Sequence, residues 1–144
     1  MIVPDANLLI YAYDPDSPFH ESARAWWTGC LSGREAVGLT HVTTFAFVRI
    51  TTQRRIFEQP LSLDEALGHV GSWLQRSVAR VLLPDVGHVD SVADLLRAAG
   101  GAGGNLVTDA QIAELAIAHN GVVHTADHDF RRFPKLAVRF PLDR

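Results

Sequence analysis

Cysteine and lysine are scarce in this sequence of 144 residues, and each scarcity excludes a class of protein. Cys30 is the only cysteine, so no disulfide can form within the chain, and a reducing compartment is the simplest expectation. Lys135 is the only lysine beside twelve arginines, and it follows no glycine run, which excludes a phosphate-loop NTPase. The glycine run at residues 100–104 lacks the third glycine of a dinucleotide-binding fingerprint.

Long apolar runs and a strong excess of one charge are also missing. No stretch is long enough for a signal peptide or a membrane span, which favours a cytoplasmic protein. The net charge of −3 argues against a polycation that coats nucleic acid. A hydrophobic content of 47% with 20% charged residues is typical of a globular protein. With domains of roughly 150 residues as the prior, we expect residues 1–144 to form a single domain.

Short apolar runs alternate with segments of helical period along the whole chain. The runs predict strands at residues 2–4, 37–40, 79–83, 122–125 and 136–140. Between them the pattern predicts helices at residues 7–13, 19–31, 43–57, 62–74, 89–99 and 105–120, and a turn or short helix at 127–133. Such alternation indicates an α/β fold with a mainly parallel central sheet of four or five strands flanked by helices.

Several helix ends carry recognisable residues. Ser62 and Glu65 have the spacing of a capping box. Thr43 or Thr44 is the expected N-cap of the third helix, and Asn120-Gly121 is a typical helix end.

Four aspartates lie at positions where ligands usually bind in proteins with a parallel sheet. Asp5 directly follows the first strand, and Asp127 and Asp129 follow the strand at residues 122–125. Asp109 lies near the start of a helix, where the macrodipole favours a carboxylate. If the first and fourth strands are neighbours, all four side chains converge beyond the carboxyl ends of the strands.

Converging carboxylates repel one another unless a cation lies between them. No lysine is close in sequence, and Arg131 and Arg132 follow the acids rather than interleave with them. Mg²⁺ or Mn²⁺ suits such an oxygen-only site and supports hydrolysis of a phosphodiester. Taken singly, each aspartate also has a purely structural interpretation as a helix cap or turn residue. Zinc bound by His124 and His128 is disfavoured, because His124 falls inside a predicted strand.

Three segments resemble the motifs of a PIN-domain nuclease. They are Val3-Pro4-Asp5-Ala6-Asn7-Leu8-Leu9, Thr108-Asp109-Ala110-Gln111-Ile112-Ala113 with Ala116 and His119, and Thr125-Ala126-Asp127-His128-Asp129-Phe130 with Phe133-Pro134. Motif order, chain length and the segment around Arg49 resemble the VapC-type toxins of bacterial toxin–antitoxin pairs. The resemblance covers nearly the whole chain and implies a PIN-like fold.

The resemblance also implies an activity and partners. The implied activity is that of a Mg²⁺-dependent endoribonuclease toxin that cuts cellular RNA such as tRNA. The implied partners are a second copy of the chain, in a homodimer, and a VapB-type antitoxin that holds the toxin inactive. Asp5, Asp109 and Asp127 would hold the metal, and Asp129 would act as a ligand or as the base that orients water. A receiver domain, which also clusters aspartates, is disfavoured because its second acid and its lysine after the last strand are missing.

One position departs from the family pattern. A glutamate usually stands three residues before the arginine matched by Arg49, where this chain has Ala46. Glu114 is no substitute, because five residues after Asp109 it is turned about 140° away around the helix. The alternative interpretation is therefore a catalytically weakened module that binds RNA or an antitoxin.

Two further groups are candidates for binding. A helix cannot bury the adjacent Trp26 and Trp27 on one narrow stripe, so we expect one in the core and one near the surface, where it could bind a partner. A C-terminal basic cluster beside the expected site consists of Arg131, Arg132, Lys135 and Arg139. These residues, Arg131 and Arg132 first among them, are candidates for binding RNA phosphates, or they simply form a solvated face.

Overall fold

The fold is an α/β arrangement around an all-parallel sheet, as the sequence predicts. The structure, a computed structural model, describes residues 1–143. Within them the sheet has five strands in the order β3-β2-β1-β4-β5. The strands are β1 (Ile2–Pro4), β2 (Val37–Thr40), β3 (Ala79–Leu82), β4 (Val122–His124) and β5 (Val138–Arg139). The helices are α1 (Ala6–Tyr13), α2 (His20–Ser32), α3 (His41–Thr51), α4 (Leu63–Leu74), α5 (His88–Ala98), α6 (Asn105–Ala118) and the 3₁₀ turn η1 (His128–Arg132).

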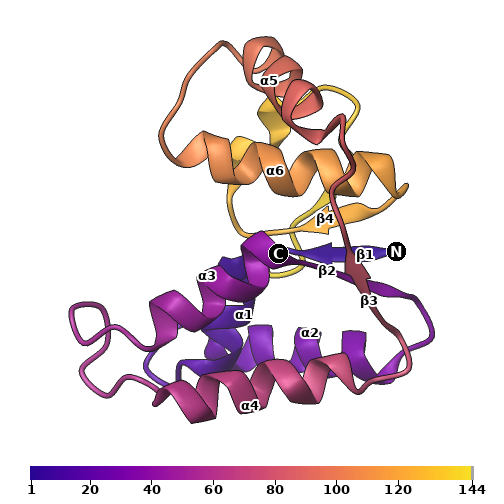
Figure 1. The fold of residues 1–144 in the computed structure, drawn as a ribbon. Coiled ribbons are helices and arrows are strands. Elements are labelled where there is room, and N and C mark those ends of the chain that lie inside the picture. The colour runs from indigo at the N-terminus through magenta and orange to yellow at the C-terminus, as the bar shows by residue number, and fades with distance from the viewer. Residues whose placement is uncertain (144) are drawn as a thin grey trace.

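Helices cover both faces of the sheet. In Figure 1, α5 and α6 lie above the strands, and α1, α2 and α4 lie below them. Each layer has its own buried core. The lower core includes Leu9, Phe47 and Trp73, and the upper core includes Ile112 and Phe130. This burial explains why the central strands β1 and β2 are fully buried and mostly apolar, as is usual for parallel sheets covered on both sides, whereas the edge strands β3 and β5 include exposed arginines.

Most helix boundaries follow the local sequence. Ser62 caps α4 by accepting a hydrogen bond from the backbone N–H of Glu65 at 3.1 Å, and Glu65 accepts one from the backbone N–H of Ser62 at 3.0 Å, so the capping box is confirmed. Asn120 ends α6 in the left-handed region at φ 55°, which confirms the helix end predicted there.

The expectation for α3 was wrong at both ends. The N-cap is Thr40, whose hydroxyl accepts from the backbone N–H of Thr43, and not Thr43 or Thr44. Thr43 is unavailable because its own hydroxyl donates to the carbonyl of Pro4 at 3.2 Å. The helix ends at Thr51 rather than near Phe57, and the Thr51 carbonyl instead accepts from the backbone N–H of Leu61 at 2.9 Å, which closes the following loop.

The pairing of β1 with β4 places the expected acids on one edge. Ile2 pairs with Val122, Val3 with Val123 and Pro4 with His124. Both strands therefore end at the same level, and Asp5 and Thr125 leave the sheet side by side. No helix among residues 1–143 is both long enough and apolar enough to cross a membrane.

Candidate active site

Asp5 is the buried anchor of the acidic cluster. It is 6% exposed and is the N-cap of α1, where its Oδ1 accepts from the backbone N–H of Ala6 at 2.8 Å. Its pKa is raised chiefly by burial, although the hydrogen bonds from Thr125 and Ala6 act in the opposite direction. The structural cap and the candidate ligand are thus one side chain, with both carboxylate oxygens already oriented.

Thr125 joins Asp5 to Asp127, and the sequence interpretation missed it. Its hydroxyl donates to Oδ2 of Asp5 at 2.8 Å and accepts from the backbone N–H of Asp127 at 2.9 Å. Thr125 is fully buried. The available clue was its spacing, because a threonine two residues before an aspartate at a strand end is typical of a hydroxyl-capped turn.

Asp109 projects from the second turn of α6 toward the other acids. Its pKa is raised to about 7, first by burial and then by the negative charges of Asp5, Asp127 and Asp129. The four aspartates that the sequence analysis selected therefore lie close enough for the charges of three of them to affect the pKa of Asp109. Glu114, five residues further along α6, instead contacts His88 of α5 and takes no part, as its position around the helix predicted.

Asp127 and Asp129 belong to one tight turn. Oδ1 of Asp127 accepts from the backbone N–H of Asp129 at 2.9 Å, which makes Asp127 the N-cap of η1. Asp129 is exposed. Asp127 is therefore held by the fold, whereas Asp129 is free to face solvent or a bound molecule.

The donor set fits a hard divalent cation. All four candidate groups are carboxylates, and no salt bridge to any of them is found among residues 1–143. Over the same residues, no group of three or more His, Cys, Asp or Glu side chains is arranged to hold a metal ion. The carboxylates therefore interact through their charges but stand apart, and they would have to move closer together to ligate one ion. Burial is the largest cause of the raised pKa of Asp109, and the negative charges of the three other aspartates raise it further.

Ala46 lies on α3, the helix after β2, as expected from its place in the sequence. It is half-buried and packs against the lower core. A methyl group at this position supplies no ligand.

Both candidate RNA-binding arginines make contacts within the protein. The guanidinium of Arg132 donates to the carbonyl of Ala99 at 2.8 Å and so ties η1 to the end of α5. The guanidinium carbon of Arg131 lies 4.5 Å from the centre of the Phe140 ring. Neither contact uses all the donors of a guanidinium, so RNA binding by these residues stays a prediction.

The two tryptophans are placed as the sequence predicts, with one in the core. Trp27 is 3% exposed, and its Nε1 has no hydrogen-bond partner among the described residues. Trp26 is half-buried, and its Nε1 donates to Nδ1 of His124 at 3.1 Å. The other histidine of the disfavoured zinc interpretation, His128, pairs with Asp143 at 3.2 Å. Partner binding by the tryptophans stays a prediction.

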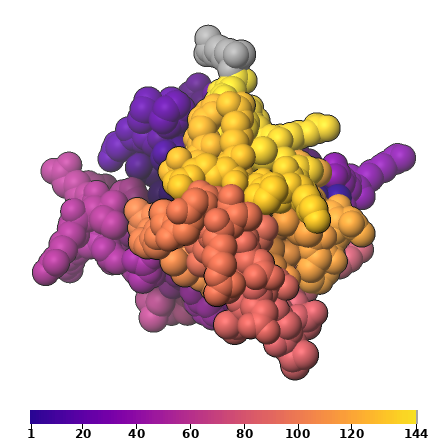
Figure 2. Space-filling view, turned by 90° about the horizontal axis from the view of Figure 1, so that it is seen from above, coloured from indigo at the N-terminus to yellow at the C-terminus, as the bar shows by residue number. Residues whose placement is uncertain are grey.

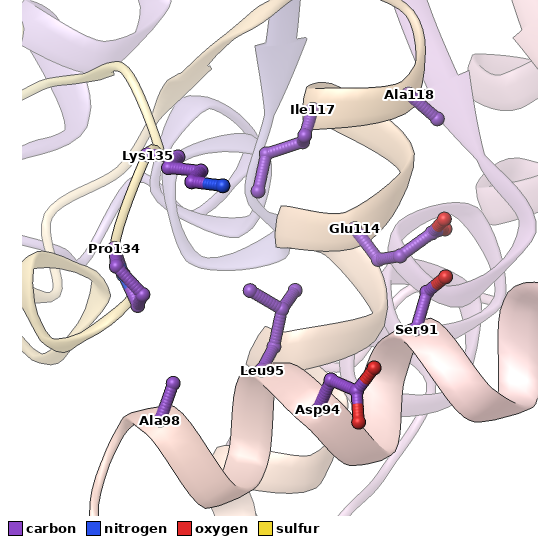
Figure 3. A pocket seen from close by; sticks show the side chains of 9 residues that line it. All are labelled: Ser91, Asp94, Leu95, Ala98, Glu114, Ile117, Ala118, Pro134 and Lys135. Carbon is purple, nitrogen blue, oxygen red and sulfur yellow. The ribbon is translucent and has the colours of Figure 1, made fainter.

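A separate cavity of about 330 Å³ lies between α5, α6 and the segment that follows η1. Figure 3 shows Glu114, Ile117 and Ala118 on one side, Leu95 and Asp94 on another, and Pro134 with Lys135 opposite. None of the four clustered aspartates lines it. Since Glu114 and Asp109 point to different faces of α6, this cavity does not belong to the acidic site.

The fold and the acidic edge define the class of protein. The PIN domain family matches residues 2–136. The chain is 37% identical to ribonuclease VapC33 of Mycobacterium tuberculosis over 142 residues, which cover 99% of both chains. It is 39% identical to ribonuclease VapC37 of the same organism over 133 residues, or 92% of both chains. The chain therefore belongs to the PIN-domain family, and within that family to the VapC-type ribonuclease toxins.

Solved structures agree on the fold at low sequence identity. The structure of VapBC2 from Rickettsia felis, bound to a DNA fragment from its promoter, matches with a TM-score of 0.68 at 17% identity over 96% of this chain and 98% of that chain. The structure of FitAB bound to a DNA fragment matches with a TM-score of 0.72 at 18% identity, covering 100% of this chain and 97% of that chain. VapC20 of M. tuberculosis, described as a toxin that cleaves the sarcin-ricin loop, has a TM-score of 0.69 at 14% identity over 95% and 99% of the two chains.

Proposed function

We propose that this protein hydrolyses phosphodiester bonds of structured RNA such as tRNA, with Asp5, Asp109 and Asp127 as ligands of Mg²⁺ and with Mn²⁺ as a substitute. The observation that carries the proposal is the gathering of carboxylates at the ends of β1 and β4, where Thr125 joins Asp5 to Asp127 and no salt bridge to the four aspartates is found among residues 1–143. In agreement with it, burial and three neighbouring carboxylates raise the pKa of Asp109 to about 7. A divalent cation relieves this repulsion, whereas an exclusively structural cluster has no reason to gather uncompensated charge.

The side chains of the site have separate roles in the proposed reaction. Thr125 fixes the position of Asp5, and the N-cap role fixes Asp127. Asp129 is exposed, so its carboxylate can orient the attacking water and accept its proton. With a pKa of about 7, Asp109 is partly protonated near neutral pH while no cation is present, and binding a cation would release that proton. When bound, Mg²⁺ supplies Lewis-acid chemistry, polarising the phosphate and favouring ionisation of water.

The direct test is cleavage of total tRNA by protein freed of any bound partner. We expect cleavage with Mg²⁺, none after addition of a chelator, and none in Asp109→Asn. Asp90→Asn is the matched control, because Asp90 is an exposed aspartate in the first turn of α5. Equal cleavage by Asp109→Asn and Asp90→Asn would refute the site assignment.

Ala46 keeps a second function open, that of a weakened module that binds RNA without cutting it efficiently. Fewer ligand charges hold a hard cation less tightly. If the site is deficient, Ala46→Glu should lower the Mg²⁺ concentration needed for half-maximal cleavage. A variant that needs more Mg²⁺ would show that the acids already present form the complete site.

We further propose a VapB-type antitoxin as the partner. A groove between α1, α2 and α4 supports this assignment. It consists of two adjoining hollows that share Thr28, one lined also by Tyr13, Arg24 and Trp27 and the other by Leu31 and Gln75. The first hollow is lined by apolar and aromatic side chains beside Arg24, and the second mainly by polar side chains including Arg76. This combination suits an amphipathic segment of another chain. An arginine of the same partner could meet the aspartates bidentately and replace the charge of the cation.

A homodimer, the other assembly implied by the family, is a separate proposal. Sedimentation equilibrium of the purified protein tests it. A mass of 15.8 kDa at all concentrations would refute it.

A further inference from the structure

A basic pocket lies beside the acidic cluster, at the carboxyl ends of β4 and β5. It has a volume of about 500 Å³, and its polar lining consists of His124, Arg131, Arg139 and Asp143. In the space-filling view of Figure 2, the C-terminal segment that forms much of this region lies at the surface of the molecule. Both arginines are exposed. The pocket is thus open to a large ligand.

The lining of this pocket carries an excess of positive charge. Asp143 is the only acid in the lining. Its Oδ2 lies 3.2 Å from Nε2 of His128, which does not line the pocket. Among residues 1–143, neither Arg131 nor Arg139 forms a salt bridge. The charge of Arg139 also reaches His124, since, after burial, it is the next largest cause that lowers the pKa of that histidine. A neutral His124 and two cationic arginines favour an anion.

Two of the donors, Arg131 and His124, are held by contacts within the protein, whereas Arg139 is exposed. The guanidinium of Arg131 lies over one side of the Phe140 ring, and His128 stacks on the ring with centroids 4.2 Å apart and planes 5° apart. The contact with the ring leaves N–H groups of the Arg131 guanidinium available to bind phosphate oxygens. His124 accepts from Trp26 through Nδ1, so its Nε2 carries the ring proton and can also donate.

Backbone and side-chain contacts connect the pocket to the aspartates. The backbone N–H of Thr125 donates to the carbonyl of Arg139 at 3.1 Å, and the Thr125 hydroxyl donates to Asp5. Only β4 lies between β1 and β5. With neighbouring strands about 4.8 Å apart, the pocket lies on the order of 10 Å from Asp5. A single RNA strand can therefore contact the acidic cluster and the pocket at once.

We propose that this pocket binds a backbone phosphate of the RNA substrate next to the one that is cleaved, through Arg139 and Arg131. The inference rests on the proposed ribonuclease function and extends it. It assigns the phosphate contact to Arg139 and Arg131, which line this pocket, and not to Arg132, which does not line it. The acidic cluster repels RNA in the absence of a cation, so a fixed positive site beside it determines where the strand lies.

The test measures the salt dependence of RNA binding in an Asp109→Asn background, which prevents cleavage. Fluorescence anisotropy with a single-stranded RNA oligonucleotide gives the slope of log K against log salt concentration. Loss of one phosphate contact reduces that slope by about 0.7. We expect this reduction and a several-fold weaker affinity in Arg139→Gln, with a similar effect in Arg131→Gln. Arg80→Gln is the control, because Arg80 is an exposed arginine on β3, the opposite edge strand.

A second measurement locates the contact on the RNA. Oligonucleotides with a single neutral methylphosphonate are tested at successive positions. The parent protein should lose affinity at one position close to the cut, and Arg139→Gln should be insensitive at that position. In cleavage-competent protein, Arg139→Gln should raise KM and leave kcat nearly unchanged.

The outcomes separate the two proposals. A parent protein that neither binds nor cleaves RNA would overturn both the pocket assignment and the proposed function. RNA cleavage by the parent with equal salt slopes in Arg139→Gln and Arg80→Gln would overturn the pocket assignment alone. So would an Arg139→Gln variant that binds RNA normally and loses only a protein partner, because the pocket would then hold an acidic side chain of that partner.

Discussion

At the scale of single residues, the site depends on charges that the fold keeps close without neutralising them. Asp109 is the clearest case, because burial and three like charges act on its pKa in the same direction. Asp5 differs, since hydrogen bonds from Thr125 and Ala6 partly offset the effect of its burial. Burial disfavours the charged form of both aspartates, but hydrogen bonds offset part of this cost at Asp5, and this difference predicts separate behaviour on mutation.

Asp109→Asn should stabilise the metal-free protein at neutral and alkaline pH. The folded-state pKa of Asp109 is about 7, whereas the unfolded value is near 3.8. Between these values the folded protein keeps a proton that the unfolded chain has lost, so the wild-type free energy of unfolding falls as pH rises. The free energy of unfolding of the variant does not fall in this way, because asparagine does not ionise. Its melting temperature should exceed that of the wild type by a few degrees at pH 8 in chelator, and the gap should close toward pH 4.

Thermal melts from pH 4 to pH 8 check this expectation. Parallel curves for the two proteins would contradict it. Millimolar Mg²⁺ should reverse the order at pH 8, because a ligand that binds only the folded state stabilises it and the variant has lost a ligand.

Thr125→Val should weaken both the fold and the site. It removes the donor to Asp5 and the acceptor of the Asp127 N–H and leaves buried polar groups unpaired, which costs about 1–3 kcal/mol. Thr125→Ser keeps the hydroxyl and loses one methyl group, about 0.8 kcal/mol. Urea unfolding measures the difference. Cleavage by the valine variant should also need more Mg²⁺, and equal Mg²⁺ requirements for the two variants would show that Thr125 does not position the acids.

At the scale of elements, the start of α6 places Asp109. The N-cap is Gly104, at φ 63° and ψ −135°, a backbone conformation that residues with a Cβ atom rarely adopt. The neighbouring Gly103 has no positive φ, and no atom lies within 4 Å of a Cβ added there. The two glycines therefore form a matched pair for testing whether the helix start determines the site.

Gly104→Ala should destabilise the protein by about 1–3 kcal/mol, because an alanine is strained in this backbone conformation and the strain is relieved only if the start of the helix moves. Gly103→Ala should be neutral or stabilising by about 0.4–1 kcal/mol, since it only restricts the unfolded chain. Urea unfolding measures both changes, and the cleavage rate should fall in Gly104→Ala alone. Equal stability of the two variants would place the start of α6 under the control of packing rather than of Gly104.

Local sequence patterns predicted those elements whose own residues decide their ends. The capping box of Ser62 and Glu65 and the helix end at Asn120 depend on neighbours in the chain. The N-cap of α3 could not be predicted, because Thr43 is taken by the carbonyl of Pro4, 39 residues away. Thr125 was missed for the same reason, since its partner Asp5 lies 120 residues away. The four aspartates were found because strand ends converge in any parallel sheet.

At the scale of the whole molecule, the acidic cluster lies between two candidate binding surfaces, the basic pocket and the groove on the helices below the sheet. The basic pocket at the ends of β4 and β5 continues the acidic cluster along the sheet. The groove between α1, α2 and α4 lies over the lower core. Substrate and antitoxin would therefore make most of their contacts on separate surfaces and compete only at the aspartates. Inhibition should then be separable from RNA binding by mutation.

Thr28→Arg should prevent inhibition by the proposed antitoxin. Thr28 is exposed on α2 and lines both hollows of the groove, so an arginine there fills space that the partner would occupy. Trp27 is a poor choice for this experiment, since truncating a fully packed tryptophan costs about 3–5 kcal/mol and would disturb the core. Ser22→Arg is the control, because Ser22 is exposed on the same helix and lines neither hollow.

The measurement is a titration of RNA cleavage with the antitoxin that co-purifies with the protein from its native host. The rate of each variant without antitoxin is the reference. The antitoxin concentration for half-maximal inhibition should rise at least tenfold in Thr28→Arg and stay at the wild-type value in Ser22→Arg, since a tenfold change corresponds to about 1.4 kcal/mol of lost contact. Unchanged inhibition of Thr28→Arg would place the antitoxin on another surface. Equal loss in both variants would mean that added positive charge on α2, and not the filled groove, repels the partner.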